Sequence, residues 1–431
     1  MFVLPGFVDT HSHTGDEAKA PNADYAYRLW LAHGVTSIRG VPLYAVEDDA
    51  GLGDARRSAA RDITAPRIFP YAVLGSLWDG GSLRTEEDGR RWVRWAKDAG
   101  YWGMKVFNPV SPAALEGALD EAEKLEFGSV AHLGQLGVAE VNGLVAAEYG
   151  IGGLTHFYGH FESLLKDGTV QRFPSGYNYA NEQDRFSNVA DLADQIVEPG
   201  SGRWDDYLDV LLEEDVTLSP TFNIYSASRD VMRARTFEWH EEYTLPSLMA
   251  FYTPSLSSHG SYYFDWTTGD EVAWRRFYQP FMQLVNEYKN RGGRVTVGSD
   301  PGFIYQTWGF AYVGELEMLQ EAGFSPLEVV RSATIEGARE IYGQVGEEAP
   351  MGLVREGMLA DLVIVPEDPL QNFKTLYGTG TPRLNLETGE VERVGGVRWT
   401  IKGGRIYDAQ KLLADVRAMV AAQKAEMGAV N

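Results

Sequence analysis

The sequence predicts an α/β protein: a (β/α)8 barrel of the TIM-like type, followed by a small C-terminal β-sandwich-type domain. Three observations predict this architecture. Eight short apolar runs rich in β-branched residues recur along the first 300 residues, amphipathic stretches of helical periodicity lie between them, and short β-like runs return after about residue 344. The length of 431 residues allows it, because barrels of this type commonly exceed about 250 residues.

The eight predicted barrel strands alternate with helical segments, and eight such units close into a barrel. The strands are expected at 6–11, 35–40, 67–73, 103–107, 129–132, 153–156, 216–221 and 294–300. Helices are expected at 24–32, 86–99, 113–125, 138–148, 204–212, 311–321 and 326–342. Residues 1–6 are interpreted as a strand that enters the barrel directly.

We expect three parts along the chain. Residues 1–343 form the barrel, with insertions at about 157–202 and 222–293 that are long enough to cover its mouth. The second insertion is dense in aromatic residues, which favours a helical core over direct substrate contact. Residues 344–408 form the small β-domain, with strands at 362–365, 397–401 and 405–407. Residues 409–431 contain a C-terminal helix that packs on the body or on a partner subunit.

Composition excludes several classes of protein. A formal net charge of −23 argues against nucleic acid or an anionic membrane as a partner, since phosphate binding needs clustered Lys and Arg. No apolar run reaches the roughly 18 residues that a membrane helix requires. The chain has no cysteine, so disulfides and thiolate ligands are absent. It also begins without a secretory signal, although a longer precursor and the compartment are left open.

Six residues with metal-binding or basic side chains lie at or near the ends of predicted strands. His11 and His13 lie two residues apart on a strand and therefore share a face. The others are Lys105, His132, His156 and Asp300. A single histidine in an apolar strand is more often a hydrogen-bonded core residue, but six such positions at one end of a barrel indicate a shared site. Imidazole and carboxylate suit zinc, and manganese, cobalt or iron are also compatible.

Lys105 lies in an apolar strand, where loss of hydration penalises an ammonium group. A salt bridge would relieve this charge. Alternatively, carboxylation by carbon dioxide would turn the amine into an anionic metal ligand.

Together these motifs resemble the amidohydrolase superfamily, most closely its imidazolonepropionase and prolidase-like branch. The resemblance covers nearly the whole chain. It rests on the segment 4–13 (LPGFVDTHSH), the step 34–37 (GVTS), Lys105, His132, His156, the segment 297–300 (VGSD), and the C-terminal segments 333–334 (AT) and 357–363 (GMLADLV). Relatives usually carry strands of the small domain before the first barrel strand, whereas almost nothing precedes it here.

The resemblance implies a site with two divalent metal ions. His11, His13 and Asp300 would hold the first ion, His132 and His156 the second, and carboxylated Lys105 would bridge both together with a hydroxide. The implied reaction is hydrolysis of an amide or peptide-like C–N bond in a dipeptide, an N-acyl amino acid or a cyclic amide. Asp300 would act as general base and then as general acid.

Three further residues follow barrel strands and are candidate contacts for a small-molecule or short-peptide substrate: Tyr158, His160 and Tyr225. Loop packing explains each of them equally well. A mononuclear deaminase is the alternative enzyme, but it usually has a glutamate shortly after the fifth-strand histidine, where this chain has Gln135, and it would leave Lys105 without a role. A non-catalytic barrel scaffold is the second alternative. Homo-oligomerisation is left open.

Overall fold

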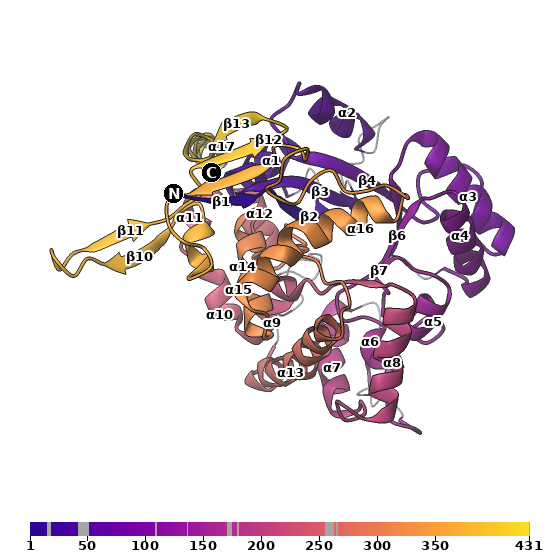
Figure 1. Cartoon of the computed structure of the whole chain (residues 1–431). Helices are drawn as coiled ribbons and strands as arrows, with labels where there is room; N and C mark the ends of the chain where they lie inside the picture. Colours follow the sequence, from indigo (N-terminus) through magenta and orange to yellow (C-terminus); the bar gives the residue numbers. More distant parts are fainter. Residues whose placement is uncertain are drawn as a thin grey trace.

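The structure is a computed structural model that describes residues 1–14, 19–41, 51–107, 110–135, 137–169, 175–178, 181–254, 263 and 266–430. At its centre lies a parallel sheet of seven strands, which follow one another in chain order from β2 to β8 (Figure 1). The strands are β2 (Phe7–His13), β3 (Val35–Val41), β4 (Arg67–Val73), β5 (Gly103–Val106), β6 (Gly128–Ala131), β7 (Gly153–Thr155) and β8 (Thr217–Ser219).

The segment predicted as the eighth strand closes the sheet into a barrel, although it is not a regular strand. On one side, the segment pairs with β8: the Leu218 N–H donates to the Arg294 carbonyl (2.9 Å), and the Leu218 carbonyl accepts from the Thr296 N–H (2.9 Å). On the other side, the segment pairs with β2: the Thr10 N–H donates to the Val297 carbonyl (2.9 Å), and the Asp300 N–H donates to the His11 carbonyl (2.9 Å). The predicted barrel fold is confirmed.

Helices pack around this sheet, as parallel strands buried on both faces require. Those of the first half are α1 (Ala23–Ala32), α2 (Leu52–Ala60), α3 (Glu86–Ala99), α4 (Pro112–Lys124), α5 (Gly143–Glu148), α6 (His160–Ser163), α7 (Glu182–Val189) with η1 (Ala190–Asp194), and α8 (Gly202–Glu213). Helix α3 begins and ends where the sequence predicts, because Thr85 and Asp88 form a capping box and Gly100 adopts a left-handed conformation at its end.

The second half contains shorter helices and one long one. They are η2 (Phe222–Tyr225), α9 (Ser226–Arg229), α10 (Val231–Arg235), α11 (His240–Tyr243), α12 (Pro246–Tyr252), α13 (Thr268–Asn290), α14 (Phe310–Glu321), α15 (Pro326–Arg331), η3 (Ser332–Glu336) and α16 (Gly337–Gly343). The single helix predicted over 326–342 is interrupted by a π-helical turn at η3. Aromatic residues of α13 are buried, and Trp274 stacks on Tyr225 at 5.5 Å between ring centroids.

A second sheet joins the two ends of the chain. Its order is β1–β9–β12–β13, with bounds β1 (Phe2–Pro5), β9 (Leu362–Val365), β12 (Trp399–Lys402) and β13 (Arg405–Asp408). Residues 2–5 therefore belong to the small sheet and do not simply enter the barrel: Gly6 separates β1 from β2, and Val3 pairs with Ile364. Helix α17 (Ala409–Val430) packs against α1 and α11, on the body of the protein.

The sequence did not predict the remaining pair of strands. After η4 (Phe373–Leu376), β10 (Thr381–Leu384) and β11 (Val391–Val394) form an antiparallel hairpin that projects from the body (Figure 1). None of the described helices combines the length and apolarity that crossing a bilayer requires.

Candidate metal centre

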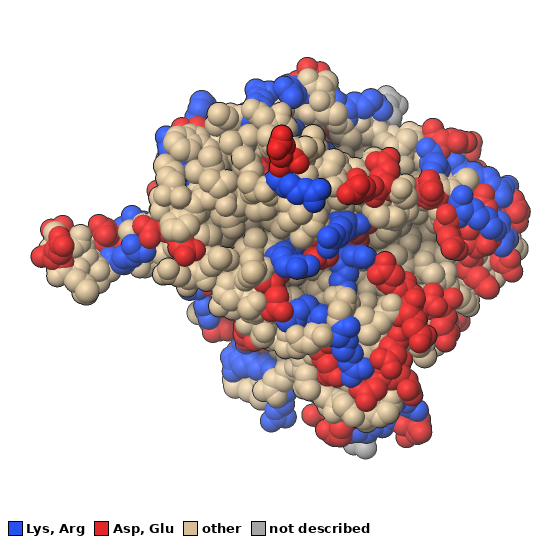
Figure 2. Space-filling model, viewed as in Figure 1, with Lys and Arg blue, Asp and Glu red and all other residues tan. Residues whose placement is uncertain are grey.

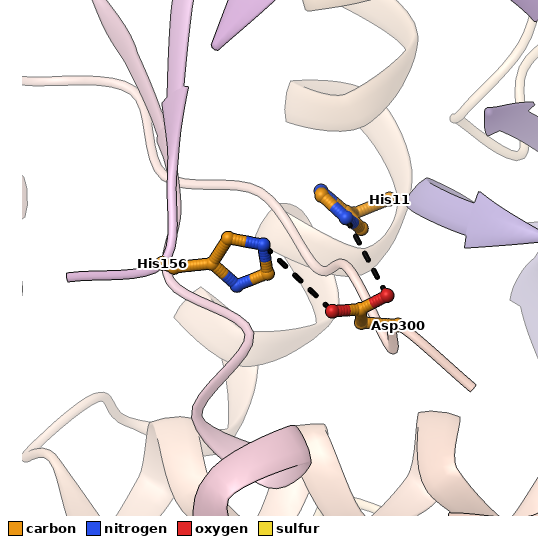
Figure 3. Close-up of side chains that lie close together, drawn as sticks. All are labelled: His11, His156 and Asp300. Atoms are coloured by element: carbon orange, nitrogen blue, oxygen red, sulfur yellow. Dashed lines mark ion pairs between the residues drawn. The ribbon is translucent and has the colours of Figure 1, made fainter. Parts of the chain in front are cut away.

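Three histidines surround the Asp300 carboxylate at the carboxyl ends of the barrel strands. One carboxylate oxygen lies 3.5 Å from Nε2 of His11 and 3.4 Å from Nε2 of His13, and the other lies 3.7 Å from Nε2 of His156. Figure 3 shows His11 and His156 converging on Asp300 from separate elements. The ligand atoms of His11, His156 and Asp300 all lie within 4.8 Å of one another, a spacing that suits a single metal ion.

The other two predicted residues lie beside this group. Lys105 Nζ, on β5, is 2.9 Å from His11 Nε2. The His132 ring follows β6, and its centroid is 4.4 Å from that of His156. The structure therefore brings all six sequence-predicted residues into one cluster.

Hydrogen bonds to the outer ring nitrogens fix the orientation of two histidines. His13 Nδ1 contacts the Val41 carbonyl at 3.2 Å and must donate, since a carbonyl only accepts. His156 Nδ1 is bonded to the Thr221 hydroxyl, which itself donates to the Pro220 carbonyl at 2.7 Å and so accepts from the ring. In both residues the unprotonated Nε2 consequently faces Asp300, as in metal-binding histidines.

Burial favours the neutral form of three histidines in the cluster. Burial lowers the pKa of His11, His13 and His156 well below 6.5, and the positive charges of neighbouring groups lower it further. The Nε2 atoms of these histidines thus face the oxygens of the Asp300 carboxylate at 3.4 to 3.7 Å. The buried His156 Nε2 has no hydrogen-bond partner among the described residues. A cation between these atoms would satisfy all of them, so the residues fit a divalent metal.

Lys105 is 4% exposed, and burial lowers its pKa to about 7, although the charge of Asp300 acts in the opposite direction. A substantial fraction of the side chain is therefore a neutral amine at neutral pH. This is the form that can react with carbon dioxide to give a carbamate.

The backbone is strained at three residues of the site. His156, Thr221 and Asp300 have φ of 65°, 48° and 43°, in the left-handed region that residues with a Cβ rarely adopt. Such conformations persist where the surrounding structure enforces them, and they are common at functional sites. Here they occur at two candidate ligands and at the hydroxyl that orients one of them.

Asp9 is a supporting residue that the sequence analysis missed. Its buried carboxylate accepts from the Ser299 N–H (3.0 Å), the Trp30 indole (3.0 Å) and the His11 N–H (3.3 Å). Burial raises its pKa to about 6, although these hydrogen bonds oppose the shift. Asp9 therefore ties β2 to the backbone before Asp300. Its position two residues before His11 was a usable signal, because alternate residues of a strand share a face.

Lys19 is a second residue that the sequence analysis missed. Its Nζ lies 3.5 Å from the ring centroid of Phe303, and that ring in turn lies edge-on to His13 at 6.1 Å. Because the contact joins residues far apart in the chain, no local pattern could have revealed it.

Two of the three candidate substrate contacts lie next to the histidines. The Tyr158 ring stacks on His132 (4.5 Å), the Tyr225 ring lies 5.8 Å from that of His156, and the Tyr225 hydroxyl donates to the Tyr158 hydroxyl (2.9 Å). Burial raises the pKa of Tyr158, which keeps its hydroxyl protonated. His160 is instead buried on α6, where its Nδ1 is bonded to the Tyr207 hydroxyl at 2.5 Å. A substrate contact by His160 stays a prediction.

Comparisons with known proteins show which folds this chain resembles. No protein-family profile matches the chain. An allantoinase from Streptomyces avermitilis is 30% identical over 116 residues, which span 26% of this chain and 24% of that protein, so the match covers about a quarter of either.

Solved structures match over almost the whole chain. A bottromycin amidohydrolase has a TM-score of 0.62 and 19% identity, covering 98% of this chain and 80% of that one. A Xaa-Pro dipeptidase has a TM-score of 0.56 and 16% identity (94% and 86% covered), and the ochratoxinase of A. niger has a TM-score of 0.56 and 15% identity (94% and 83% covered). The chain thus has the barrel fold of prolidases and amidohydrolases, and the predicted resemblance is confirmed at the level of the fold.

Proposed function

We propose that this protein is a metal-dependent amidohydrolase that cleaves an amide or peptide-like C–N bond. The observation that carries the proposal is the group of neutral imidazole nitrogens facing the Asp300 carboxylate in the barrel mouth. The fold that the chain shares with prolidases and amidohydrolases, and the short match to an allantoinase, support the same reaction class.

The site would hold two divalent ions, with zinc as the first candidate and manganese, cobalt or iron as alternatives. His11, His13 and Asp300 would bind one ion, His132 and His156 the other, and Lys105 would join them as its carbamate. When bound, such ions supply a water-derived nucleophile at neutral pH and polarise the scissile carbonyl.

The side chains of the protein then account for proton transfer and orientation. Asp300 would accept a proton during attack and return it to the leaving amine, as general base and then general acid. Because Tyr225 donates to the Tyr158 hydroxyl, the proton of Tyr158 is available for a substrate oxygen. This pair would orient the acyl group over the histidines. The candidate substrates are dipeptides, N-acyl amino acids and cyclic amides.

The test is metal reconstitution combined with a substrate screen. Protein stripped of metal and reloaded with zinc, manganese or cobalt is assayed against dipeptide, N-acyl amino acid and cyclic amide libraries, and bound metal is counted. About two metal equivalents and C–N hydrolysis support the proposal. About one equivalent with ammonia release from an amino-substituted ring would indicate the deaminase instead, and neither metal nor hydrolysis would indicate a scaffold.

Carboxylation of Lys105 has its own readout. Protein equilibrated with ¹³C-bicarbonate should give a carbamate signal in carbon NMR that is lost in Lys105→Met. The matched control is Lys124→Met, since Lys124 is an exposed lysine that pairs with Asp120 on α4. A signal that survives in Lys105→Met would rule out this role.

A further inference from the structure

The hairpin β10–β11 exposes an apolar face far from the metal centre. It forms a sheet of its own and lies away from the body in Figures 1 and 2. Leu384 pairs with Val391 across the hairpin, and Leu386 follows in the turn that joins the two strands. These three side chains are 54%, 72% and 89% exposed, respectively. A two-stranded hairpin in water gains little from such exposure, so this face is suited to contact another surface.

The loop that carries Leu386 has a defined shape. The Asn385 N–H donates to the Glu390 carbonyl (2.8 Å), and the Asn385 side chain accepts from the Glu387 and Thr388 N–H groups (3.0 and 3.2 Å). The most exposed leucine is therefore presented by an ordered turn, which lowers the entropy that binding would cost.

The base of the hairpin offers a matching hollow. A cavity of about 190 Å³ lies between the hairpin and the small sheet, and Pro366, Thr379, Arg393 and Arg398 contribute to its walls. Its size is sufficient for one large aliphatic side chain. Gly395 and Gly396 line the same hollow.

Charge differs between the two ends of the hairpin. Between residues 384 and 391 the tip carries Glu387 and Glu390 and no basic residue, and Figure 2 shows acidic side chains at this tip. The base carries Arg393, paired with Glu238, and Arg398, paired with Asp408 at 3.1 Å. Both arginine side chains remain at least 40% exposed and have further N–H donors.

We propose that the hairpin is a dimerisation arm whose partner is a second copy of this chain. Two hairpins related by a two-fold axis run antiparallel, so that Leu386 of each copy enters the hollow at the base of the other. This arrangement brings the acidic tip of one copy to the arginines of the other, and it repeats the same contact twice, as a closed symmetric dimer requires. A chain with a net charge of −23 repels its own copies, and at the base the exposed guanidinium groups, each of which already pairs with one carboxylate, offer further donors to the acidic tip.

The test is the mass of the full-length protein in solution, measured by sedimentation over about 1 to 100 µM. The wild type should be a dimer and Leu386→Asp a monomer, with unchanged circular dichroism. Leu327→Asp is the matched control, because Leu327 is a 61% exposed leucine at the start of α15, and this variant should remain dimeric. A monomeric wild type, including one that binds only some other protein, would overturn the proposal, and so would a dimeric Leu386→Asp.

Charge exchange tests the antiparallel arrangement. Glu387→Arg and Arg398→Glu should each weaken association by about tenfold, and the double variant should recover most of the loss because the opposite charges meet again. Failure of the double variant to recover would contradict contact between tip and base.

Discussion

Two buried polar clusters lie inside the barrel, one nearer the amino ends of its strands and one at their carboxyl ends, and they differ in how their charges are balanced. At the amino end, Arg39 of β3 pairs with Glu340 of α16 and also donates to the Thr10 carbonyl (2.7 Å). Glu340 lies beside Gly153, the first residue of β7. At the carboxyl end, imidazoles that burial keeps neutral face the Asp300 carboxylate, and the Lys105 amine lies 2.9 Å from His11 Nε2. The first cluster pairs a full positive charge with a negative one. In the second, burial lowers the pKa of Lys105 to about 7, so the lysine is only partly charged and a bound cation would complete the charge balance.

From this difference we expect enzymatic activity to depend on the cluster at the carboxyl ends of the strands. The stability of the metal-free protein should depend on the Arg39–Glu340 cluster. In (β/α)8 barrels, chemistry is generally located at the carboxyl ends of the strands, and the amino end contributes to stability. The four predictions below test that division, from the largest expected effect to the smallest.

Asp300→Asn should lower kcat/KM by about 1,000-fold, since the amide cannot accept the proton, while the urea midpoint of the metal-free protein changes little. Steady-state kinetics on the metal-loaded protein measure the effect. Asp206→Asn, on the exposed surface of α8, is the control. Full activity of Asp300→Asn would remove Asp300 from proton transfer.

Glu340→Gln should destabilise the protein by about 3 to 5 kcal/mol, because it leaves the guanidinium of Arg39 buried without its counter-charge. The measurement is the free energy of unfolding in urea. The double variant Arg39→Met with Glu340→Leu removes both charges and should recover most of this loss. A large loss of kcat in folded Glu340→Gln protein would contradict the proposed division.

Thr221→Val should weaken zinc binding by about 10- to 100-fold, because His156 loses the hydroxyl that holds Nδ1 protonated and Nε2 directed at Asp300. Competition with a chelating dye measures the affinity. Thr236→Val is the matched control, since the Thr236 hydroxyl donates to the Met232 and Arg233 carbonyls near the surface. Equal affinities in both variants would show that Thr221 does not orient the histidine.

Glu315 should make stability depend on pH. Its buried carboxyl accepts from the N–H groups of Phe222 (3.0 Å) and Asn223 (2.6 Å), next to Thr221, and burial raises its pKa from 4.5 to about 8. The pKa of Glu315 is higher in the folded protein than in the unfolded chain. The contribution of its protonated carboxyl to the free energy of unfolding is therefore complete below pH 4.5 and is lost as the pH rises through 8. Between pH 5 and 8 the wild type should lose about 1 to 3 kcal/mol more than Glu315→Gln. Parallel urea titrations of the two proteins would detect the difference, and identical slopes would contradict it.

The sequence predicted those parts of the fold that depend on local pattern. His11 and His13 share a face because side chains alternate along a strand, and each barrel strand was found within a few residues because apolar runs alternate with capped helices. The convergence of six side chains followed from one rule, that parallel strands in a barrel end at the same edge.

The parts that were missed depend on long-range contacts. Strand β1 pairs with residues about 360 positions away, and nothing in residues 2–5 specifies that partner. Thr221 orients a histidine 65 residues earlier in the chain, and Lys19 packs on Phe303. The hairpin β10–β11 was missed because its strands are short and carry exposed charges.

The pairing of β1 with β9 has a consequence for synthesis on the ribosome. His11 and His13 leave the ribosome almost 300 residues before Asp300 and the segment that closes the ring, and the partner of β1 follows later still. The proposed metal site therefore cannot be completed until the segment that carries Asp300 has been synthesised, so capture of an ion by this site would follow synthesis of the whole barrel.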